Sequence, residues 1–407
     1  MSNNREYDII ILGGGMVGAA LACALENIPL KIALLDRFKP NFDWPIEGYE
    51  LRVSALTYAS QQILKKIGAW DKMVARRVSP FTDMHVWDAT GDGEIQFHAE
   101  DIGKPCLGHI VENRVTQGAL FEQLETLNNV DYLQPIVAKS IQSDANKTTL
   151  RLDNGDTITA KLIVGADGGR SWVRDQANIQ LNSYNYEQKG VVTTVKTTKH
   201  HNQVARQRFL PTGPLAFLPL TEGRCSIVWS TNYEDADRLV ALEEKAFMVE
   251  LESALGESDL GHVETVSQRA AFPLIKQHAE RYCDNRLVLV GDAAHTIHPL
   301  AGQGVNLGLL DIATLAEELI SATGKRRDIG SQQVLRKYER RRKGDNTLML
   351  NSMDGFHLLF ANDNKMLSQA RNIGLKLTNN ILPVKSKLIE HAMGIDRKIP
   401  LVQLSAE

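Results

Sequence analysis

A glycine-rich turn near the amino terminus constrains the fold more than any other feature. The run Gly13-Gly14-Gly15-Met16-Val17-Gly18 separates an apolar strand-like segment (residues 7–12) from a helix-like segment (residues 16–27), and a second apolar segment (residues 31–35) ends at Asp36. In such a unit the first glycine permits a tight turn, the next lets a pyrophosphate approach the backbone, and the last lets the helix pack on the strand. The acidic residue then accepts hydrogen bonds from an adenosine ribose. This unit predicts dinucleotide binding and does not distinguish NAD from FAD.

Two later segments are also predicted to be buried strands that end in an acidic residue. Residues 162–164 lead into Gly165-Ala166-Asp167-Gly168, and residues 287–290 lead into Gly291-Asp292. Ligands of open α/β sheets bind beyond the carboxyl ends of the strands. A long ligand that crosses several strand ends fits FAD better than NAD. Taken alone, the Asp167 segment is also compatible with an ordinary helix cap.

The segment after Asp292 predicts the place of the flat end of that ligand. Gly302 and Gly304 lie where a helical pattern (residues 305–319) begins. Glycines at a helix start let backbone N–H groups approach a ligand, and the helix dipole favours negative charge there. A ring that becomes anionic when it is reduced suits this position, and a flavin is such a ring.

Composition bounds the remaining classes. The chain has 407 residues, a net charge of −3, 43% hydrophobic and 23% charged residues, so nucleic-acid binding has no support. The cysteines (Cys23, Cys106, Cys225 and Cys283) lack the spacing of metal ligands or of a redox pair, and we expect no metal and no disulfide framework. The glycines that interrupt residues 9–25 argue against a membrane span there.

The motifs lie in separate blocks, with β-rich sequence between them. We expect a doubly wound, Rossmann-like α/β domain that binds FAD and comprises residues 1–75, 101–180 and 275–345. A β-sheet substrate domain (76–100 and 181–274) interrupts it, and a helical region (346–407) follows. Turns at Gly91-Asp92-Gly93 and Asn154-Gly155 predict hairpins, and residues 235–255 predict one charged helix.

Together these motifs resemble those of the para-hydroxybenzoate-hydroxylase-like, single-component flavin monooxygenases. Residues 298–308 (His-Pro-Leu-Ala-Gly-Gln-Gly-Val-Asn-Leu-Gly), with Asp311, are similar to the signature of the hydroxylases of ubiquinone biosynthesis. The segments 52–56 and 108–113 resemble the same family. Residues 216–220 and 225–230 are most similar to the bacterial hydroxylases that act at C5 of 2-polyprenylphenol.

The resemblance implies an FAD-dependent aromatic-ring monooxygenase that uses O2 and hydroxylates a hydrophobic polyprenylphenol. The electrons come from a transient NAD(P)H or, alternatively, from a partner protein. In that chemistry a flavin C4a-hydroperoxide delivers the oxygen, and the protein orients the phenol and excludes water. The cofactor-binding residues that the motifs and the resemblance together give are Gly13, Gly15, Val17, Gly18, Asp36, Arg37, Arg52, Asn113, Arg114, Asp167, Asp292, Gly302, Gln303, Gly304, Val305 and Asn306.

Several alternatives stay open at this level. Related enzymes have an arginine where this chain has Asn113, and either Asn113 or Arg114 reaches the cofactor. We interpret His295 and His298 as partners of backbone groups in the loop, and no catalytic base is assigned. Another ring position, or a non-catalytic flavin-binding component of a biosynthetic complex, is the alternative function. We expect a cytoplasmic protein; peripheral contact with the inner membrane, other proteins of the pathway as partners, and a homo-oligomer are further alternatives.

Overall fold

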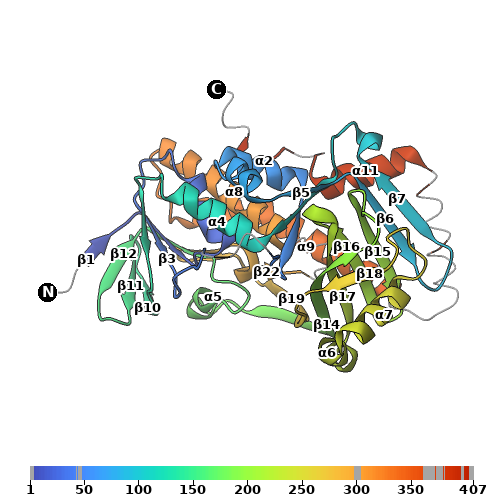
Figure 1. Ribbon diagram of the computed structural model, residues 1–407. Coiled ribbons are helices and arrows are strands. Elements are labelled where there is room, and N and C mark those ends of the chain that lie inside the picture. Colours follow the sequence, from blue (N-terminus) through green and yellow to red (C-terminus); the bar gives the residue numbers. More distant parts are fainter. Residues whose placement is uncertain are drawn as a thin grey trace.

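Two large sheets organise the chain (Figure 1). The computed structural model describes residues 4–42, 44, 48–297, 304–360, 372, 379, 381–395 and 398–402. The first sheet has six strands in the order β20-β21-β13-β2-β3-β9. Its strands are β2 (Ile9–Leu12), β3 (Ile32–Leu35), β9 (Val130–Leu133), β13 (Leu162–Gly165), β20 (Cys283–Asp284) and β21 (Leu287–Leu289).

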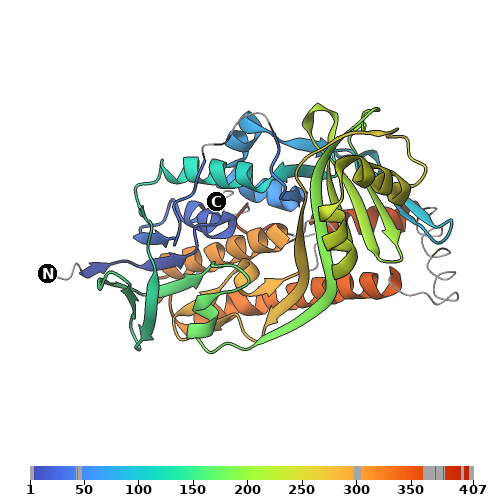
Figure 2. The ribbon, with the colours of Figure 1, turned by 60° about the horizontal axis from the view of Figure 1, so that its bottom comes forward.

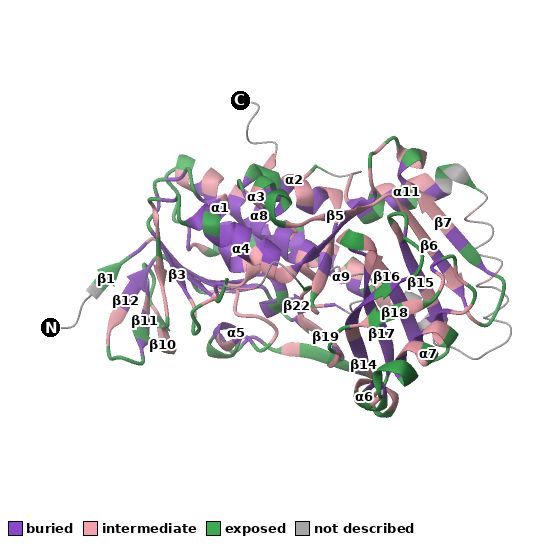
Figure 3. Ribbon diagram, viewed as in Figure 1, coloured by how far each residue is buried: buried purple, intermediate pink, exposed green. Residues whose placement is uncertain are grey.

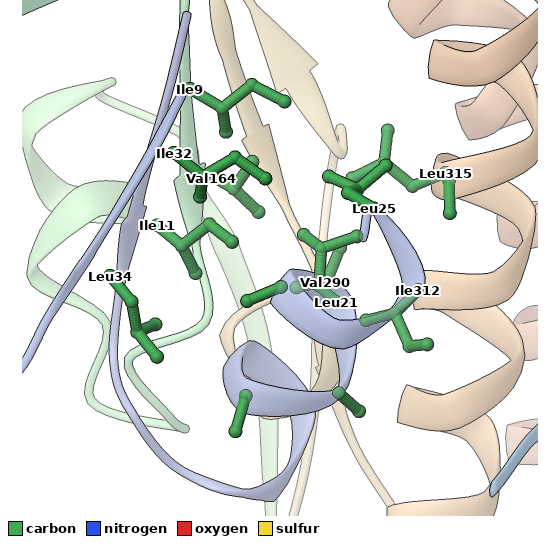
Figure 4. Close-up of a cluster of buried hydrophobic side chains, with 14 of the residues drawn as sticks. Ile9, Ile11, Leu21, Leu25, Ile32, Leu34, Val164, Val290, Ile312 and Leu315 are labelled. Carbon is green, nitrogen blue, oxygen red and sulfur yellow. The ribbon is translucent and has the colours of Figure 1, made fainter. Parts of the chain in front are cut away.

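The core of the six-stranded sheet is apolar because its strands are buried on both faces. Apart from the short β20, neighbouring strands in it pair in parallel. Helices α1 (Met16–Ala24), α4 (Asn113–Leu124) and α8 (Gly304–Gly324) cover one face. Figure 4 shows Leu21 of α1 and Ile312 of α8 beside the strand residues Ile11 and Val164. These near-continuous hydrophobic strands are typical of a doubly wound α/β fold, which was the predicted class.

The second sheet has nine strands and is built from separate parts of the chain. The hairpin of β6 and β7 joins strands that follow more than eighty residues later, through the parallel pairing of β6 with β15. The strands are β6 (Asp83–Asp88), β7 (Glu94–His98), β14 (Leu181–Thr197), β15 (Val204–Leu210), β16 (Gly213–Pro219), β17 (Arg224–Asn232), β18 (Val263–Val266), β19 (Ala270–Ala279) and β22 (His295–Thr296).

Two smaller sheets complete the strands: β1 (Asn4–Glu6) with β10 (Ala138–Ser143), β11 (Thr148–Leu152) and β12 (Thr157–Ala160), and β4 (Val53–Leu56) with β5 (Ser79–Phe81) and β8 (Gly108–Glu112). Both predicted hairpins are confirmed, because β6 pairs antiparallel with β7 and β11 with β12. The other α-helices of the described residues are α2 (Tyr58–Lys66), α3 (Trp70–Arg76), α5 (Trp172–Gln176), α6 (Tyr233–Ala241), α7 (Glu244–Leu255), α9 (Gln332–Phe360) and α11 (Leu382–Met393).

The prediction of one charged helix over residues 235–255 is wrong, because two helices, α6 and α7, lie there. The chain is extended at Leu242 and Glu243, and the Glu243 carboxylate accepts a hydrogen bond from the backbone N–H of Lys245. The Arg269 guanidinium donates to the carbonyl oxygens of Leu239 and Leu242. It thereby satisfies carbonyls that the end of α6 leaves without partners.

The long helix α9 connects the two large sheets. It packs beside α8 along the six-stranded sheet and continues toward the nine-stranded sheet (Figure 2). Buried residues concentrate in the six-stranded sheet, its covering helices and the centre of the nine-stranded sheet (Figure 3). Among the described helices, we find none with the length and apolar character that crossing a bilayer requires.

Replacing Gly18 tests the close packing of α1. A Cβ at Gly18 would lie 1.9 Å from the carbonyl oxygen of Gly13, so Gly18→Ala must displace the turn. We expect a loss of about 1–3 kcal/mol in the free energy of unfolding, measured in urea. Gly344→Ala in α9 is the matched control, because a Cβ there meets nothing within 4 Å. That variant should be stabilised by about 0.5–1 kcal/mol, and equal effects of the two substitutions would contradict the packing argument.

Candidate functional site

The strand register brings the sequence motifs to one edge of the six-stranded sheet. Leu12 pairs with Leu35 and with Gly165, and Gly165 pairs with Leu289. The residues that follow these strands therefore share that edge, and they include Gly13, Asp36, Asp167 and Asp292. Ligands of open parallel sheets bind at this edge.

The glycine turn after β2 forms one end of the site. Gly13 has φ of +110°, and a Cβ on it would lie 2.3 Å from the carbonyl oxygen of Ala166, so only glycine fits there. A Cβ on Gly15, in contrast, meets no atom within 4 Å. Gly15 thus presents open backbone at the start of α1, which is the approach that a pyrophosphate needs.

Asp36 and Gln117 hold this turn in shape. Asp36 accepts hydrogen bonds from the backbone N–H of Gly14 (Oδ2, 2.7 Å) and of Phe38 (Oδ1, 3.0 Å). The Gln117 side-chain nitrogen donates to the carbonyl oxygen of Gly14 at 3.2 Å. Gln117 was not among the predicted residues; it lies one helical turn after Asn113 on α4, and that spacing was the available signal.

Asp292 and the start of α8 form the other end of the site. A Cβ on Gly304 would lie 4.0 Å from the Asp292 Oδ1, so this carboxylate is next to the first turn of α8. Asp292 has accessible surface in the cavity that it lines, although protein atoms surround it. The surrounding protein atoms keep water from the Asp292 carboxyl and thereby raise its pKa. Electrostatic interactions with His295 and Arg52 act in the opposite direction and lower this pKa.

Hydrogen bonds of the Asn306 side chain connect the start of α8 to the end of β4 and the start of α2. Its Oδ1 accepts hydrogen bonds from the backbone N–H of Thr57 (3.0 Å) and from the Ser60 hydroxyl (2.6 Å). Its Nδ2 donates to the carbonyl oxygen of Ala55 at 2.8 Å. The Asn306 side chain therefore positions the helix terminus, while Gly304 and Val305 line the cavity beside it.

A buried carboxylate, Asp311, connects this end of the site to α9. Its Oδ2 is 2.5 Å from the His295 Nε2 and accepts the Gly291 N–H at 3.1 Å. Its Oδ1 accepts from the Arg342 Nε (2.8 Å) and the Asn346 Nδ2 (3.2 Å). Burial by itself would raise the pKa of Asp311, but the neighbouring His295 and Arg342 outweigh it and lower the value to about 2. We call these five residues the Asp311 network.

The Asp311 network corrects the interpretation of His295, whose ring contacts a side-chain carboxylate rather than backbone groups of the loop. The partner was missed because it lies sixteen residues further along the chain, inside a helix. His298, Gly302 and Gln303 lie outside the described residues.

The side chains of Asn113 and Arg114 have different surroundings. Asn113 lines the cavity and accepts a hydrogen bond from the Ser54 hydroxyl at 2.7 Å. Arg114 instead pairs with the buried Glu112 at 2.8 Å, and its backbone N–H donates to Glu50 at 2.7 Å. This placement favours Asn113 as the residue that reaches a cofactor.

Of the other predicted residues, some line the cavity and others lie outside its lining. Arg52 lines it, and its guanidinium carbon is 5.9 Å from the centre of the Phe272 ring. Val17 lines it too and packs against Gly291. Asp167 accepts the Val173 N–H at 3.1 Å with one oxygen, while its other oxygen is buried without a partner among the described residues. Arg37 is exposed beside Asp36.

A cavity of about 1280 Å³ joins both ends of the site to the nine-stranded sheet. From the glycine turn and Asp292 it passes under one face of that sheet. Its far wall includes apolar side chains from α9 and α11: Leu348, Met349, Met353, Leu388, Ile389 and Met393. The same helices also contribute the charged or polar residues Arg341, Arg342, Asp345, Ser352 and His391.

FAD fits the residues that are present. The open backbone at Gly15 suits a pyrophosphate, and near the same edge the buried Oδ1 of Asp167 has no partner within the described part of the chain. The start of α8 suits a ring that gains negative charge. Together they match a ligand that extends from the glycine turn to Asp292.

Comparison with known proteins places these features in a family. A family model described as an FAD binding domain matches residues 6–350. The chain is 38% identical to the ubiquinone hydroxylase UbiL of Rhodospirillum rubrum, over 97% of this chain and 91% of that protein. It is 35% identical to the 3-demethoxyubiquinol 3-hydroxylase of Escherichia coli, over 96% of this chain and 100% of that protein. It is also 35% identical to human ubiquinone biosynthesis monooxygenase COQ6, over 96% and 93%.

Solved structures agree on the fold. The p-nitrophenol 4-monooxygenase PnpA of Pseudomonas putida superposes with a TM-score of 0.80 at 18% identity, over 97% of this chain and 99% of that chain. PqsL of Pseudomonas aeruginosa, described as a probable FAD-dependent monooxygenase, gives a TM-score of 0.77 at 21% identity, over 92% and 100%. The predicted α/β fold with a second sheet and a helical carboxyl-terminal part is therefore confirmed.

Gly15→Ala tests the cofactor end without disturbing the fold. Because the added methyl group meets no protein atom, the free energy of unfolding of the FAD-free protein should not fall. The methyl group does occupy the space for the pyrophosphate, and the dissociation constant of FAD should rise about 10- to 100-fold. Fluorescence titration of FAD into apoprotein measures this, with Gly324→Ala, which also has free space, as the control. Unchanged FAD affinity would place the pyrophosphate elsewhere.

Arg342→Met tests the Asp311 network. Loss of one partner of a buried ion pair is expected to cost about 3–5 kcal/mol in urea unfolding. Adding Asp311→Asn removes the uncompensated charge and should recover part of that loss in a double-mutant cycle. Because the pKa of folded Asp311 is about 2 and its ordinary value is 3.8, its stabilising contribution is complete above about pH 4 and is lost as the pH falls toward 2. Strictly additive effects would show that the two residues do not interact.

Proposed function

This chain belongs to the FAD-dependent monooxygenases of ubiquinone biosynthesis, and we propose that it hydroxylates the aromatic ring of a polyprenylated phenol or quinol. The observation that carries the proposal is the cavity, which has a polar end suited to FAD and a far wall with many apolar side chains. The names of the relatives, which include a ubiquinone hydroxylase, a ubiquinone biosynthesis monooxygenase and a demethoxyubiquinol hydroxylase, support a hydrophobic quinone precursor as substrate.

The apolar wall supports a long prenyl chain as part of the substrate. The side chains that α9 and α11 contribute there include leucine, isoleucine and methionine. Burying apolar surface contributes about 25 cal/mol per Å², so a chain of several isoprene units would bind firmly in such a space. Methionines such as Met349 and Met353 adapt to an irregular ligand.

We propose that FAD is held along the edge of the six-stranded sheet. Gly13, Gly15 and Gly18 shape the turn for the pyrophosphate, with Val17 packed beside it. Asp36 and Arg37 would lie at the adenosine. The residues toward the flavin would be Arg52, Asn113, Asp167, Asp292 and residues 304–306. Arg114 is assigned a supporting role through Glu112, because its side chain is paired there.

FAD, when it is bound, supplies the activation of O2 for ring hydroxylation. In the overall reaction the ring C–H becomes C–OH, the second oxygen atom leaves as water, and NAD(P)H supplies two electrons. The protein positions the ring between the start of α8 and the nine-stranded sheet. Its apolar lining excludes water, which would otherwise end the reaction without product. Arg52 and the α8 dipole stabilise negative charge at the ring of the cofactor.

The ring position is proposed from the relatives. The segments 216–220 and 225–230 predicted hydroxylation at C5, and none of the relatives described above is named for that position. The Escherichia coli relative is named a 3-hydroxylase and matches along its whole length. We therefore favour the alternative that the chain acts at another ring position of the same pathway, on a demethoxyquinol-type ring.

The proposal is tested by oxygen labelling. Purified protein with FAD, NADPH and 18O2 is given a short-chain prenylated demethoxyquinol or, separately, a 2-prenylphenol. We expect one 18O atom in the ring of the demethoxyquinol product, located by mass spectrometry and NMR. Preferential labelling of the 2-prenylphenol at C5 would favour the original expectation. FAD binding without any labelled product from either ring would favour a non-catalytic component.

A further inference from the structure

One face of the nine-stranded sheet packs into a hydrophobic core, and the other face lines the cavity. On β17 the side chains of Cys225, Ile227 and Trp229 pack into a buried cluster that also contains residues of α6 and α7. The alternate residues Val228 and Ser230 line the cavity. Neighbouring strands follow the same alternation, as a pleated sheet requires. The strand register therefore determines which side chains face the cavity.

On the cavity face, the amide of Gln207 lies in a row of small apolar side chains. Gln207 of β15 pairs with Ala216, Ala216 with Val228, and Val228 with Val192. All four line the cavity. The Gln207 amide is therefore framed by alanine and valine side chains, and these small residues leave space for a flat ring above the sheet.

Gln207 is buried in the protein but free toward the cavity. Its relative exposure is 7%, and its side chain lines the cavity. No atom of its amide is among the fully enclosed polar atoms that lack a partner in the described part of the chain. The amide is therefore accessible from the cavity, where a ligand can hydrogen-bond it.

Ser230 adds a second polar group on the same face. It lines the cavity, is 2% exposed, and pairs across the sheet with Gly190, which has no side chain to cover it. Ser230 lies two residues beyond Val228, one row along from Gln207. Both polar groups thus belong to the sheet face of the cavity, whereas α9 and α11 contribute apolar residues together with charged and polar ones such as Arg341, Asp345 and His391.

We propose that Gln207 is a specificity-determining residue that hydrogen-bonds an oxygen substituent of the substrate ring, with Ser230 as a second polar group two strands away on the same face. The inference rests on the proposed function and names the group that recognises the ring. An amide both donates and accepts, so it can bind a hydroxyl, a carbonyl or a methoxy oxygen. The contact fixes the rotation of the ring, and it thereby selects the carbon that faces the cofactor.

Gln207→Met is the test variant, because methionine keeps the length of the side chain and removes its hydrogen bonds. Two prenylated phenols that differ only in one ring oxygen substituent are compared for kcat/KM, and for dissociation constants by flavin difference spectra. Wild-type protein should prefer the more oxygenated ring by about tenfold, which is the value of one hydrogen bond. Gln207→Met should lose that preference and retain FAD affinity. Gln142→Met, on an exposed position of β10, is the matched control.

The outcomes separate this inference from the proposed function. If wild type and Gln207→Met show the same preference, Gln207 does not read the ring. If wild type neither binds nor hydroxylates either ring, the proposed function fails as well. Gln207→Glu is a second variant that controls for a folding defect, because it keeps the shape of the side chain and a hydrogen-bond acceptor. A carboxylate accepts hydrogen bonds but does not donate them. This variant should therefore retain binding of the hydroxylated ring and lose binding of the methoxylated or carbonyl-bearing ring. Equal binding of all rings by this variant would overturn the proposal.

Discussion

The buried Asp311 carboxylate is the interaction on which the site depends. It joins the Gly291 turn, the β22 residue His295, the helix α8 and, through Arg342, the helix α9. Each of these elements contributes to the cavity or supports it. A buried charge without partners would cost several kcal/mol, so the network forms as a unit or destabilises the fold. The cofactor edge and the substrate wall are therefore fixed relative to each other by one carboxylate, which a local loop contact could not achieve.

The two large sheets divide the chemistry between them. The six-stranded sheet presents strand ends, glycine backbone and a helix terminus, all of which suit a charged cofactor. In the nine-stranded sheet, the strand register determines which side chains face the cavity. One face of this sheet packs against α6 and α7, and the other face lines the cavity. Because α9 reaches from one sheet to the other, its apolar residues close the space between them. The proposed oxygen chemistry is therefore assigned to the region where these two parts of the cavity meet.

The sequence predicted those features that depend on local spacing. The glycine turn, Asp36 and both hairpins follow from residues close together in the chain, and the structure agrees on their geometry. Other features depend on distant partners. The break between α6 and α7 involves Arg269, and the role of His295 depends on Asp311. Neighbouring helix positions point in different directions, so sequence alone left Asn113 and Arg114 unresolved, although only Asn113 lines the cavity.

Hydroxylation at one ring carbon requires two separate constraints on the substrate. A prenyl chain against α9 and α11 fixes where the ring lies and the direction from which it enters, but apolar contacts leave rotation about the chain axis free. A directional hydrogen bond from the sheet face removes that freedom. If the prenyl chain and Gln207 act together on the proposed substrate, regiochemistry depends on a few side chains of the cavity face. Homologues with the same cofactor edge could then act on different carbons of one ring.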